Sequence, residues 1–462
     1  GGHQASSASI VSIMTALYFN ILKPEDRVAV KPHASPVFHA IQYLSGLQTI
    51  EKIKNFRGFG GAQSYPSRTK DIDDVDISTG SVGLGVAMTS FVSLIQDYIL
   101  SKQYKKNISK GRMIALVGDA ELDEGNVYEC LQEGWKHDLR NVWWIIDYNR
   151  QSLDGVVHEG LSERLSSVFE AFGWNLIVIK YGKFQQDAFK EPGGEELKKW
   201  IDECPNQLYS ALIYEGGAAF KERLLDDIGD QNKVSALINK RSDNDILDLM
   251  GNLGGHCVPT LCKAFESIKD DKPTAFIAYT IKGWGTPLAG HKDNHAGLMT
   301  KSQMEVFKSK LGIIDGSEWN SFADEKEGLD IDSHLKNLPF QKAKHRRFKS
   351  EKINLDDIVA IKETKISTQN AFGKILDQYA KNNSEFSDRI ITTSPDVSVS
   401  TNLGSWVNRK GLFSRNDGSD TFRDRKIPSA QKWIFSPKGQ HIELGIAEMN
   451  LFLLLGAAGL SH

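Results

Sequence analysis

Cysteine is scarce in this chain of 462 residues, which contains only four, and no two of them form a CxxC pair. A disulfide framework or a zinc site built on cysteine needs closely and regularly spaced cysteines, so the sequence favours neither. The four are Cys130, Cys204, Cys257 and Cys262.

The chain also lacks an excess of charge of either sign. It has 56 Lys and Arg against 59 Asp and Glu, a formal net charge of −3. This balance argues against a strongly basic nucleic-acid binder and against an acidic disordered tail. One basic run, KAKHRRFKSEK at residues 342–352, is a candidate nucleic-acid patch. In a nearly neutral chain we interpret it instead as the solvated face of a linker, and we expect no nucleic-acid partner.

Long hydrophobic runs are absent as well. The longest apolar stretch, residues 451–460, is about half of the ~20 residues needed to span a bilayer. The first residues also lack the basic start and apolar core of a signal peptide. We therefore expect a soluble protein with no membrane partner, located in the cytoplasm or, in a eukaryote, in the mitochondrial matrix.

Short apolar runs alternate with helical stretches, which predicts an α/β fold of mostly parallel sheets flanked by helices. The first part of the chain has predicted strands at residues 27–30, 113–117, 142–147, 176–180 and 275–281, and predicted helices at 4–22, 83–104 and 125–137, with a mostly helical insertion at 212–269. A charged and polar connection follows from about residue 301 to 361. The last part has a predicted helix at 365–381, strands at 389–393 and 433–435, and a helix beginning at Ile442.

Two strand ends carry side chains suited to a metal ion. One predicted strand ends in Gly118-Asp119, and the next ends in Asp147-Tyr148-Asn149. Parallel strands would bring Asp119 and Asn149 together at the carboxyl edge of the sheet. A carboxylate, an amide oxygen and a nearby backbone carbonyl suit Mg²⁺ or Ca²⁺ completed by diphosphate oxygens and water. Spacing alone is equally compatible with a helix-capping Asp and a turn Asn.

A series of motifs surrounds these two residues. GGHQAS, HASP, QSYPS, STGSVGLG, NRQSLDG, GGH at 254–256, TIKGWG and HIELGIAEMN follow one another along the chain. A Gly-Asp-x opening with a later Asn at a strand end resembles the thiamine diphosphate fingerprint. In this order the motifs resemble the homodimeric decarboxylating component of pyruvate dehydrogenase, a family of the transketolase-like superfamily.

The resemblance implies a thiamine-diphosphate-binding fold of transketolase-like type. Residues 1–300 would form the diphosphate-binding domain, 301–361 an interdomain linker, and 362–462 the first part of a pyrimidine-binding domain. Both ends of the sequence fall in stretches that look ordered, GGHQASSAS and EMNLFLLLGAAGLSH. We therefore expect the chain to be part of a longer protein.

The resemblance also assigns cofactor and metal ligands. Mg²⁺ would be held by Asp119, Asn149 and the backbone of Gln151. The thiamine diphosphate would lie near Ser6, His33, Tyr65, Ser81, Val82, Gly83, Gly118, Asp119, Ala120, Glu121 and Asn149. The glycines of STGSVGLG allow a backbone to approach an anion closely, but they stand in the wrong order for a GxGxxG dinucleotide loop.

The strongest catalytic candidate is Glu448, in GIAEMN. In the resembled family this carboxylate hydrogen-bonds a ring nitrogen of the cofactor and promotes loss of a proton from its reactive carbon. We expect burial in an apolar helix to tune the proton affinity of Glu448, and we expect the neighbouring Glu443 to lie on a helix surface. Further catalytic candidates are His3, His33, His295, Lys282 and Asp396. The pair His291 and His295 mimics a zinc motif, but no HExxH glutamate accompanies it.

The implied reaction is oxidative decarboxylation of a 2-oxo acid, with pyruvate favoured, and transfer of the acyl group to a lipoyl group on an acyltransferase partner. The site would lie between the subunits of a homodimer. Two alternatives remain open: ketol transfer between sugar phosphates by a transketolase, and a noncatalytic relic that binds the cofactor or nothing.

Three positions depart from the resembled pattern. Ala120 stands where the family has a second glycine, Lys31 where it usually has Gln, and Asp147 where it usually has Asn. The new charges are expected to change diphosphate affinity or substrate choice rather than to abolish cofactor binding.

Overall fold

The computed structural model describes residues 3–104, 109–152, 155–229, 232–320, 328–342, 346 and 352–460. The chain forms two compact units. The first comprises Gly1–Val86, Gly111–Glu124 and Asn141–Lys344, and the second comprises Ala87–Lys110, Gly125–Arg140 and His345–His462. The units therefore do not follow one another along the chain, and the boundaries 1–300, 301–361 and 362–462 stay predictions.

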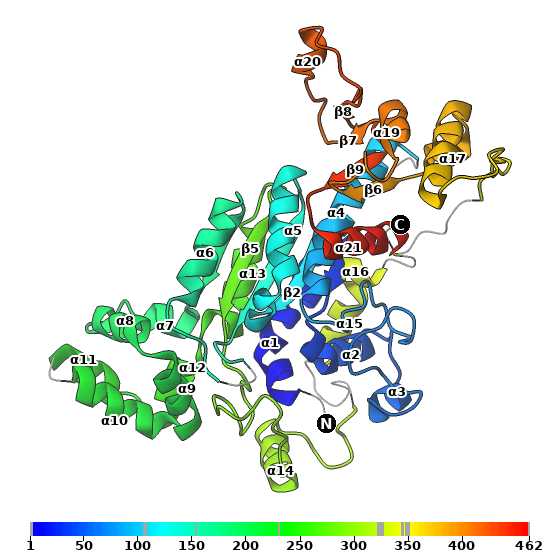
Figure 1. Cartoon of the computed structure of the whole chain (residues 1–462). Coiled ribbons are helices and arrows are strands. Elements are labelled where there is room, and N and C mark those ends of the chain that lie inside the picture. Colours follow the sequence, from blue (N-terminus) through cyan, green and yellow to red (C-terminus); the bar gives the residue numbers. More distant parts are fainter. Residues whose placement is uncertain are drawn as a thin grey trace. The chain divides into compact units, whose positions relative to one another are not determined.

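The first unit is built on a five-stranded sheet in the order β1-β2-β3-β5-β4, in which all paired strands are parallel (Figure 1). This confirms the predicted parallel α/β architecture. The strands are β1 (Arg27–Ala29), β2 (Met113–Gly118), β3 (Val142–Tyr148), β4 (Asn175–Ile179) and β5 (Thr274–Tyr279).

The central strands are continuous apolar runs because both of their faces are covered. Every residue of β2 and of β3 is buried, as is usual for parallel strands between helical layers. Ile10, Met14 and Leu17 lie in the core that backs this sheet, and their side chains are fully buried. They come from the predicted N-terminal helix, which forms as α1 (Gln4–Ala16) followed by one π-helical turn at Leu17–Ile21.

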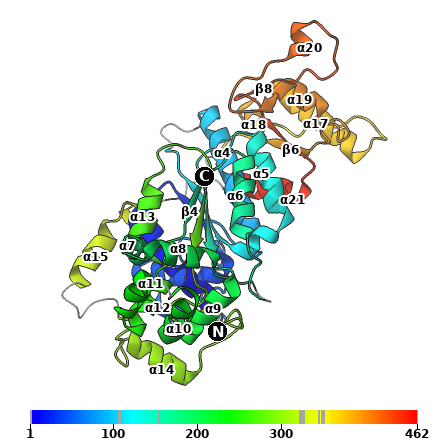
Figure 2. The same cartoon turned by 90° about the vertical axis from the view of Figure 1, so that its left-hand side faces the viewer.

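A group of short helices between β4 and β5 lies beside the sheet (Figure 2). It begins well before the helical insertion predicted at 212–269 and contains α7 (Lys183–Ala188), α8 (Gly194–Glu203), α9 (Asn206–Glu215), α10 (Gly217–Ile228), α11 (Asn232–Asn239) and α12 (Asp243–Gly251). The other helices of this unit are α2 (Ser35–Leu44), α3 (Ile50–Lys54), α6 (Leu161–Ala171), α13 (Val258–Glu266), α14 (Lys301–Lys310), α15 (Gly328–Asn337) and α16 (Pro339–Lys342). Single 3₁₀ turns lie at Pro32–Ala34, Asp119–Asp123 and Gly254–His256.

The second unit has its own parallel sheet, in the order β6-β9-β7-β8. Its strands are β6 (Thr392–Pro395), β7 (Leu412–Phe413), β8 (Phe435–Ser436) and β9 (His441–Leu444). Its helices are α5 (Gly125–Lys136), α17 (Thr368–Asn382), α18 (Glu385–Asp388), α19 (Gly404–Lys410), α20 (Thr421–Asp424), α21 (Glu448–Leu460) and all but the first turn of α4 (Leu84–Lys102). Helix α4 is long and apolar enough to cross a membrane, but 72% of its most apolar window is buried in the protein, as is typical of a core helix.

The sequence-based prediction was wrong at the end of the chain. Ile442 does not begin a helix but lies in β9, and the helix begins only at Glu448. The cause is the length of β9: its four residues alternate polar and apolar side chains but are too few to show a clear period. The strands predicted at 389–393 and 433–435 are both displaced toward the C-terminus. Most of the basic run at 342–352 lies outside the described residues.

Candidate functional site

The carboxyl ends of β2 and β3 meet as predicted. Gly118 pairs with Asp147 in the parallel register, which places the next residues of both strands at one edge of the sheet. There the Asp119 carboxylate reaches across to the turn that follows β3, where its Oδ2 accepts a hydrogen bond from the backbone N–H of Arg150 at 2.7 Å. Asp119 is thus tied to the segment that carries Asn149 and Gln151.

The turn after β3 presents oxygen atoms at this edge. Asn149 Oδ1 accepts a hydrogen bond from the backbone N–H of Gln151 at 3.1 Å, and the Gln151 carbonyl accepts one from Lys282 Nζ at 3.2 Å. Asp119, Asn149 and Gln151 are each only 4% exposed. A carboxylate, an amide oxygen and a main-chain carbonyl are ligands that suit Mg²⁺.

The raised pKa of Asp119 also fits a cation site. Burial, together with the negative charge of Asp147, raises the pKa of Asp119 to about 6. A buried carboxylate of this kind is costly to ionise, and a bound divalent cation would remove that cost. The residues present therefore fit the predicted metal.

Glu121 connects two predicted cofactor-binding turns. Its Oε1 accepts a hydrogen bond from the backbone N–H of Gly118 at 2.9 Å, and its Oε2 accepts one from Gly83 at 3.2 Å. Gly83 has a φ of 78°, a conformation that favours glycine. The Gly83 N–H therefore faces a carboxylate of the protein. In this region Ser81 and Ala120 are exposed and Val82 is half-buried.

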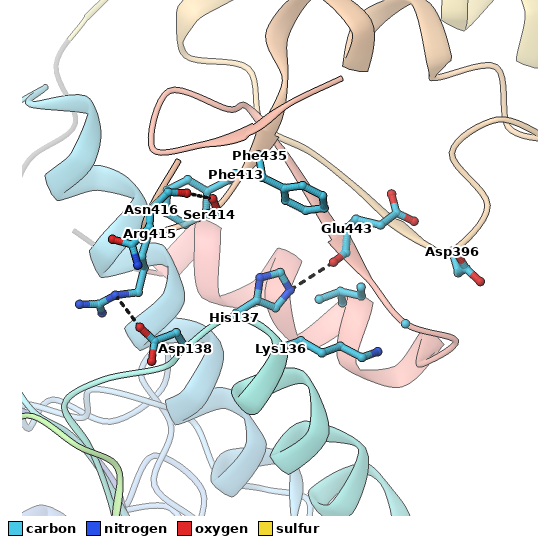
Figure 3. A pocket seen from close by; sticks show the side chains of 12 residues that line it. Lys136, His137, Asp138, Asp396, Phe413, Ser414, Arg415, Asn416, Phe435 and Glu443 are labelled. Carbon is cyan, nitrogen blue, oxygen red and sulfur yellow. Dashed lines mark hydrogen bonds and ion pairs between the residues drawn. The ribbon is translucent and has the colours of Figure 1, made fainter. Parts of the chain in front are cut away.

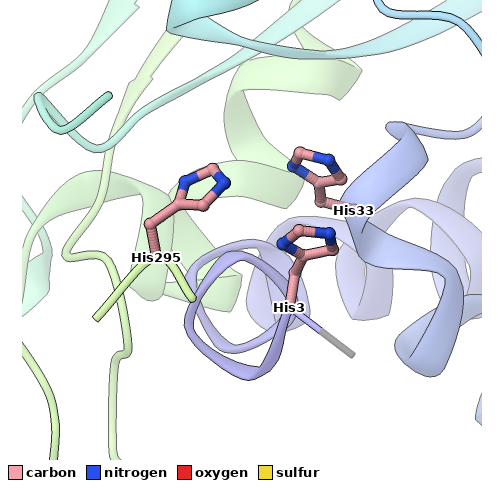
Figure 4. Close-up of side chains that lie close together, drawn as sticks. All are labelled: His3, His33 and His295. Atoms are coloured by element: carbon pink, nitrogen blue, oxygen red, sulfur yellow. The ribbon is translucent and has the colours of Figure 1, made fainter. Parts of the chain in front are cut away.

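Three predicted histidines gather beside this edge (Figure 4). The rings of His3 and His33 stack with centroids 3.7 Å apart, and His295 meets both rings edge-on at 5.3 and 5.4 Å. Tyr65 approaches His33 with ring centroids 6.0 Å apart. Burial, and then the neighbouring His3 and Lys31, lowers the pKa of His33 to about 3, and burial also lowers that of His3. Both rings are therefore neutral near pH 7.

Lys282 joins the histidine cluster to the oxygen donors. Its Nζ contacts His295 Nδ1 at 2.9 Å and donates to the carbonyls of Gln151 and Ser152 at 3.2 and 3.1 Å. Burial, and then the charge of Lys31, lowers the pKa of this 2%-exposed lysine to about 8. Of the predicted residues, Ser6 lies deeper, buried in α1, where its carbonyl accepts a hydrogen bond from Ser9 Oγ at 3.0 Å.

Sequence reasoning missed several residues that hold the site in place. His256 Nε2 accepts a hydrogen bond from the backbone N–H of Ile281 at 2.7 Å, and its ring stacks on Trp284, which fixes the segment carrying Lys282. Arg150 is buried with its guanidinium 4.9 Å from the ring centroid of Tyr209, which anchors the turn after β3. His256 and Trp284 lie in the GGH and TIKGWG motifs, but the sequence does not show that these two motifs contact each other in the fold.

A buried histidine–aspartate pair organises the loop that carries Tyr65. His39 Nδ1 contacts Asp73 Oδ2 at 2.6 Å, and its Nε2 donates to the Gln63 carbonyl at 2.9 Å. Asp73 also accepts a hydrogen bond from Gln48, while Asp71 accepts from backbone N–H groups of the same loop. Because both partners of the His39 ring accept hydrogen bonds, the ring is an imidazolium. Burial opposes this charge, but the hydrogen bond and charge of Asp73 outweigh it and raise the pKa of His39.

This pair predicts a pH-dependent contribution to stability. A histidine with a raised pKa contributes fully below its unfolded pKa of about 6.5, and the contribution is lost as pH rises through the folded value. His39→Gln is expected to lower the free energy of unfolding by about 3 kcal/mol at pH 6, because it leaves Asp73 buried without its cation. Denaturant titrations from pH 6 to 9 should show the difference from wild type shrinking with pH. His334→Gln, at an exposed site, is the control, and a pH-independent difference would contradict the ion pair.

The remaining candidates lie in the second unit. Asp396 is exposed and directly follows β6 with a φ of 61°, and it lines a cavity of about 560 Å³ at the carboxyl ends of the strands (Figure 3). His137 lines the same cavity and hydrogen-bonds the Glu443 carbonyl at 3.1 Å. Glu443 was predicted to lie on a helix surface. It is instead half-buried in β9, where its carboxylate contacts His441 and Ser398.

Glu448 is not buried within this chain. It is the first residue of α21, and the side chains that this helix buries are Asn450, Leu453, Leu454 and Ala457. The expectation of burial in an apolar helix was wrong for this chain, because Glu448 lies on the exposed face of α21. That face is apolar as well: Met449, Phe452 and Leu455 of α21 are 51%, 66% and 64% exposed, and Ile446, just before the helix, is 76% exposed.

Comparison with known proteins first identifies the fold. Residues 2–190 match the family described as transketolase, thiamine diphosphate binding domain. Among solved structures, transketolase from Pichia stipitis in complex with sedoheptulose-7-phosphate has a TM-score of 0.62 at 17% identity, covering 99% of this chain and 60% of that chain. Transketolase from Campylobacter jejuni has a TM-score of 0.60 at 18% identity, covering 99% and 63%. The chain thus has the transketolase-like thiamine-diphosphate-binding fold.

Among curated proteins, the chain is similar to pyruvate dehydrogenase E1 components. The Escherichia coli K12 protein is 27% identical over 478 residues, covering 97% of this chain and 53% of its own length. The proteins of Pseudomonas aeruginosa and Mycobacterium tuberculosis are each 26% identical over 503 residues, covering all of this chain and 54% and 52% of their own lengths. The resemblance read from the motifs is confirmed. The chain spans about half the length of these relatives.

Proposed function

We propose that this chain contributes to a thiamine-diphosphate-dependent enzyme that decarboxylates a 2-oxo acid, with pyruvate the favoured substrate. The observation that carries the proposal is the convergence of Asp119, Asn149 and Gln151, all buried, at the carboxyl edge of a parallel sheet. Parallel α/β sheets bind ligands at this edge. The similarity to pyruvate dehydrogenase E1 components supports the choice of reaction.

In this proposal the oxygen donors of Asp119, Asn149 and the Gln151 carbonyl hold Mg²⁺ and, through it, a diphosphate. When bound, thiamine diphosphate supplies a nucleophilic carbon and an electron sink for the loss of CO₂. The neutral rings of His3 and His33 can donate and accept hydrogen bonds to a bound substrate, and Lys282 contributes positive charge that a carboxylate substrate would meet. His295, in contact with Lys282 Nζ, orients that ammonium group.

We further propose that the working protein is a homodimer. Helix α21 exposes the apolar side chains Met449, Phe452 and Leu455 beside Glu448, and Ile446 is exposed just before the helix. An exposed apolar face of this kind is typical of an interface between subunits. Burying it against a second copy would surround Glu448 with apolar groups, the setting in which a carboxylate binds a ring nitrogen most strongly. Reductive acyl transfer to a lipoyl-bearing acyltransferase is proposed as the following step.

The test uses the full-length protein. Calorimetry is expected to detect thiamine diphosphate binding that requires Mg²⁺, and CO₂ release is expected from pyruvate or 2-oxobutyrate. Ketol transfer between sugar phosphates without CO₂ release would favour the transketolase reaction instead. Absence of Mg²⁺-dependent cofactor binding would contradict both reactions and identify the chain as noncatalytic.

A further inference from the structure

Two of the positions that depart from the resembled pattern are partners of each other. Lys31 Nζ lies 2.7 Å from Asp147 Oδ2, and the two side chains are 6% and 0% exposed. Burial alone would disfavour both charges. Their separation is that of a charge-assisted hydrogen bond, in which mutual attraction offsets the cost of burial. Both groups are therefore ionised, and together they add no net charge to the site.

This pair lies against the proposed metal ligands. Lys31 packs on Gly118, the residue before Asp119, so closely that a Cβ at Gly118 would lie 3.1 Å from Lys31 Cε. The Asp147 carboxylate also accepts hydrogen bonds from Ser9 Oγ at 2.6 Å and from Thr280 Oγ1. The carboxylate is thereby held in a single position.

Asp147 also determines which way the Asn149 amide faces. Asn149 Nδ2 donates to Asp147 Oδ2 at 3.4 Å. An ionised carboxylate only accepts hydrogen bonds, so the amide nitrogen must turn toward Asp147. Asn149 Oδ1 is left on the side of the Gln151 backbone, where it accepts the Gln151 N–H.

We propose that Lys31 and Asp147 act as one charge-neutral unit that sets the affinity of the adjacent oxygen site for Mg²⁺ and orients the Asn149 ligand. This inference rests on the proposed function. Both are positioning residues, since neither is proposed to touch the metal or the substrate.

The proposal predicts opposite effects for the two single substitutions. Asp147→Asn leaves the Lys31 ammonium uncompensated beside the metal site, and a buried positive charge repels a divalent cation. Lys31→Gln leaves the Asp147 carboxylate uncompensated, and a buried negative charge attracts the cation. Removing both charges restores neutrality, and the amide that replaces the Asp147 carboxylate would still accept a hydrogen bond from Asn149 through its oxygen. A role in folding alone would give no such reversal of sign.

The experiment measures the Mg²⁺ concentration that half-saturates the full-length protein at saturating thiamine diphosphate, followed by tryptophan fluorescence. We expect the half-saturating Mg²⁺ concentration to rise about tenfold in D147N and to fall in K31Q. In the double variant K31Q/D147N it should lie within about threefold of wild type. Denaturant midpoints without Mg²⁺ and cofactor should fall for both single variants and recover in the double variant, because each single change strands a buried charge.

Asp26→Asn provides the matched control. Asp26 is 2% exposed and pairs with Arg112 at the amino edge of the same sheet, so this change also breaks a buried ion pair. It is expected to lower the denaturant midpoint and leave the Mg²⁺ requirement unchanged.

Each outcome decides the proposal. Weaker Mg²⁺ binding in both single variants, with no recovery in the double variant, would overturn it. If K31Q does not fold, the comparison of D147N with the double variant decides, because the second substitution must restore affinity. If wild type binds thiamine diphosphate without needing Mg²⁺, or not at all, the proposed function fails and this inference with it, a result distinct from failure of the charge pattern alone.

Discussion

Replacing Asn149 by Ala is expected to weaken Mg²⁺-dependent binding of thiamine diphosphate by at least about 100-fold. The substitution removes the one amide oxygen of the proposed ligand set and takes from the backbone N–H of Gln151 the acceptor that it has in Asn149 Oδ1. Turnover should fall in proportion, since the cofactor is no longer retained. Calorimetry at a fixed Mg²⁺ concentration measures the affinity, and CO₂ release at saturating pyruvate measures the turnover.

The matched control for this prediction is Asn175→Ala. Asn175 begins β4 at the opposite, amino edge of the same sheet, where its Nδ2 donates to Asp270 at 3.1 Å. We expect this variant to lose a little stability and to keep its cofactor affinity. If an Asn149→Ala protein bound cofactor and turned over normally, the carboxyl edge of β3 would not be part of the cofactor site.

Replacing Glu448 by Gln is expected to lower kcat by about 10²–10⁴-fold, the range associated with loss of a positioned acid–base group. The amide keeps the shape of the side chain but cannot carry the charge that draws a proton onto a ring nitrogen. Because Gln has nearly the same shape and volume as Glu, the thermal midpoint should change little. Cofactor affinity should fall much less than kcat.

Glu385→Gln controls for loss of a carboxylate at the start of a helix in the same unit. Glu385 is exposed in the first turn of α18 and is not proposed to act in catalysis. Its replacement should leave kcat unchanged. If Glu448→Gln retained wild-type kcat, the proposed role of the second unit in catalysis would be wrong, while the metal site of the first unit would still stand.

The parts of the fold and site that could be predicted from the sequence are those that depend on local pattern. Strands β2 and β3 are long apolar runs, and their ends place Asp119 and Asn149 at one edge once the strands are known to be parallel. The motifs containing His3, His33 and His295 made these residues catalytic candidates, and the structure brings the three side chains together. The roles of these residues stay predictions.

The features that could not be predicted depend on contacts between distant parts of the chain. Lys31 and Asp147 each appeared as a separate departure from a pattern, and only the fold shows that their charges cancel. Likewise, nothing near His39 in the sequence indicates that Asp73 would hold it as a cation. Strand β9 was missed because four residues between two glycine-containing turns carry too little periodicity, and the burial of Glu443 was missed with it.

The division of the chain into units has a practical consequence for dissecting the protein. The second unit takes residues 87–110 and 125–140 from the middle of the first, so a fragment beginning at residue 345 would lack both α4 and α5. It would lose the Glu133 carboxylate that accepts the Gly445 N–H at 3.1 Å and the Asn126 carbonyl that accepts Asn450 Nδ2 at 3.2 Å. If the chain were cut near residue 345, the two pieces should therefore stay associated, and the C-terminal fragment expressed alone should fail to form a stable domain.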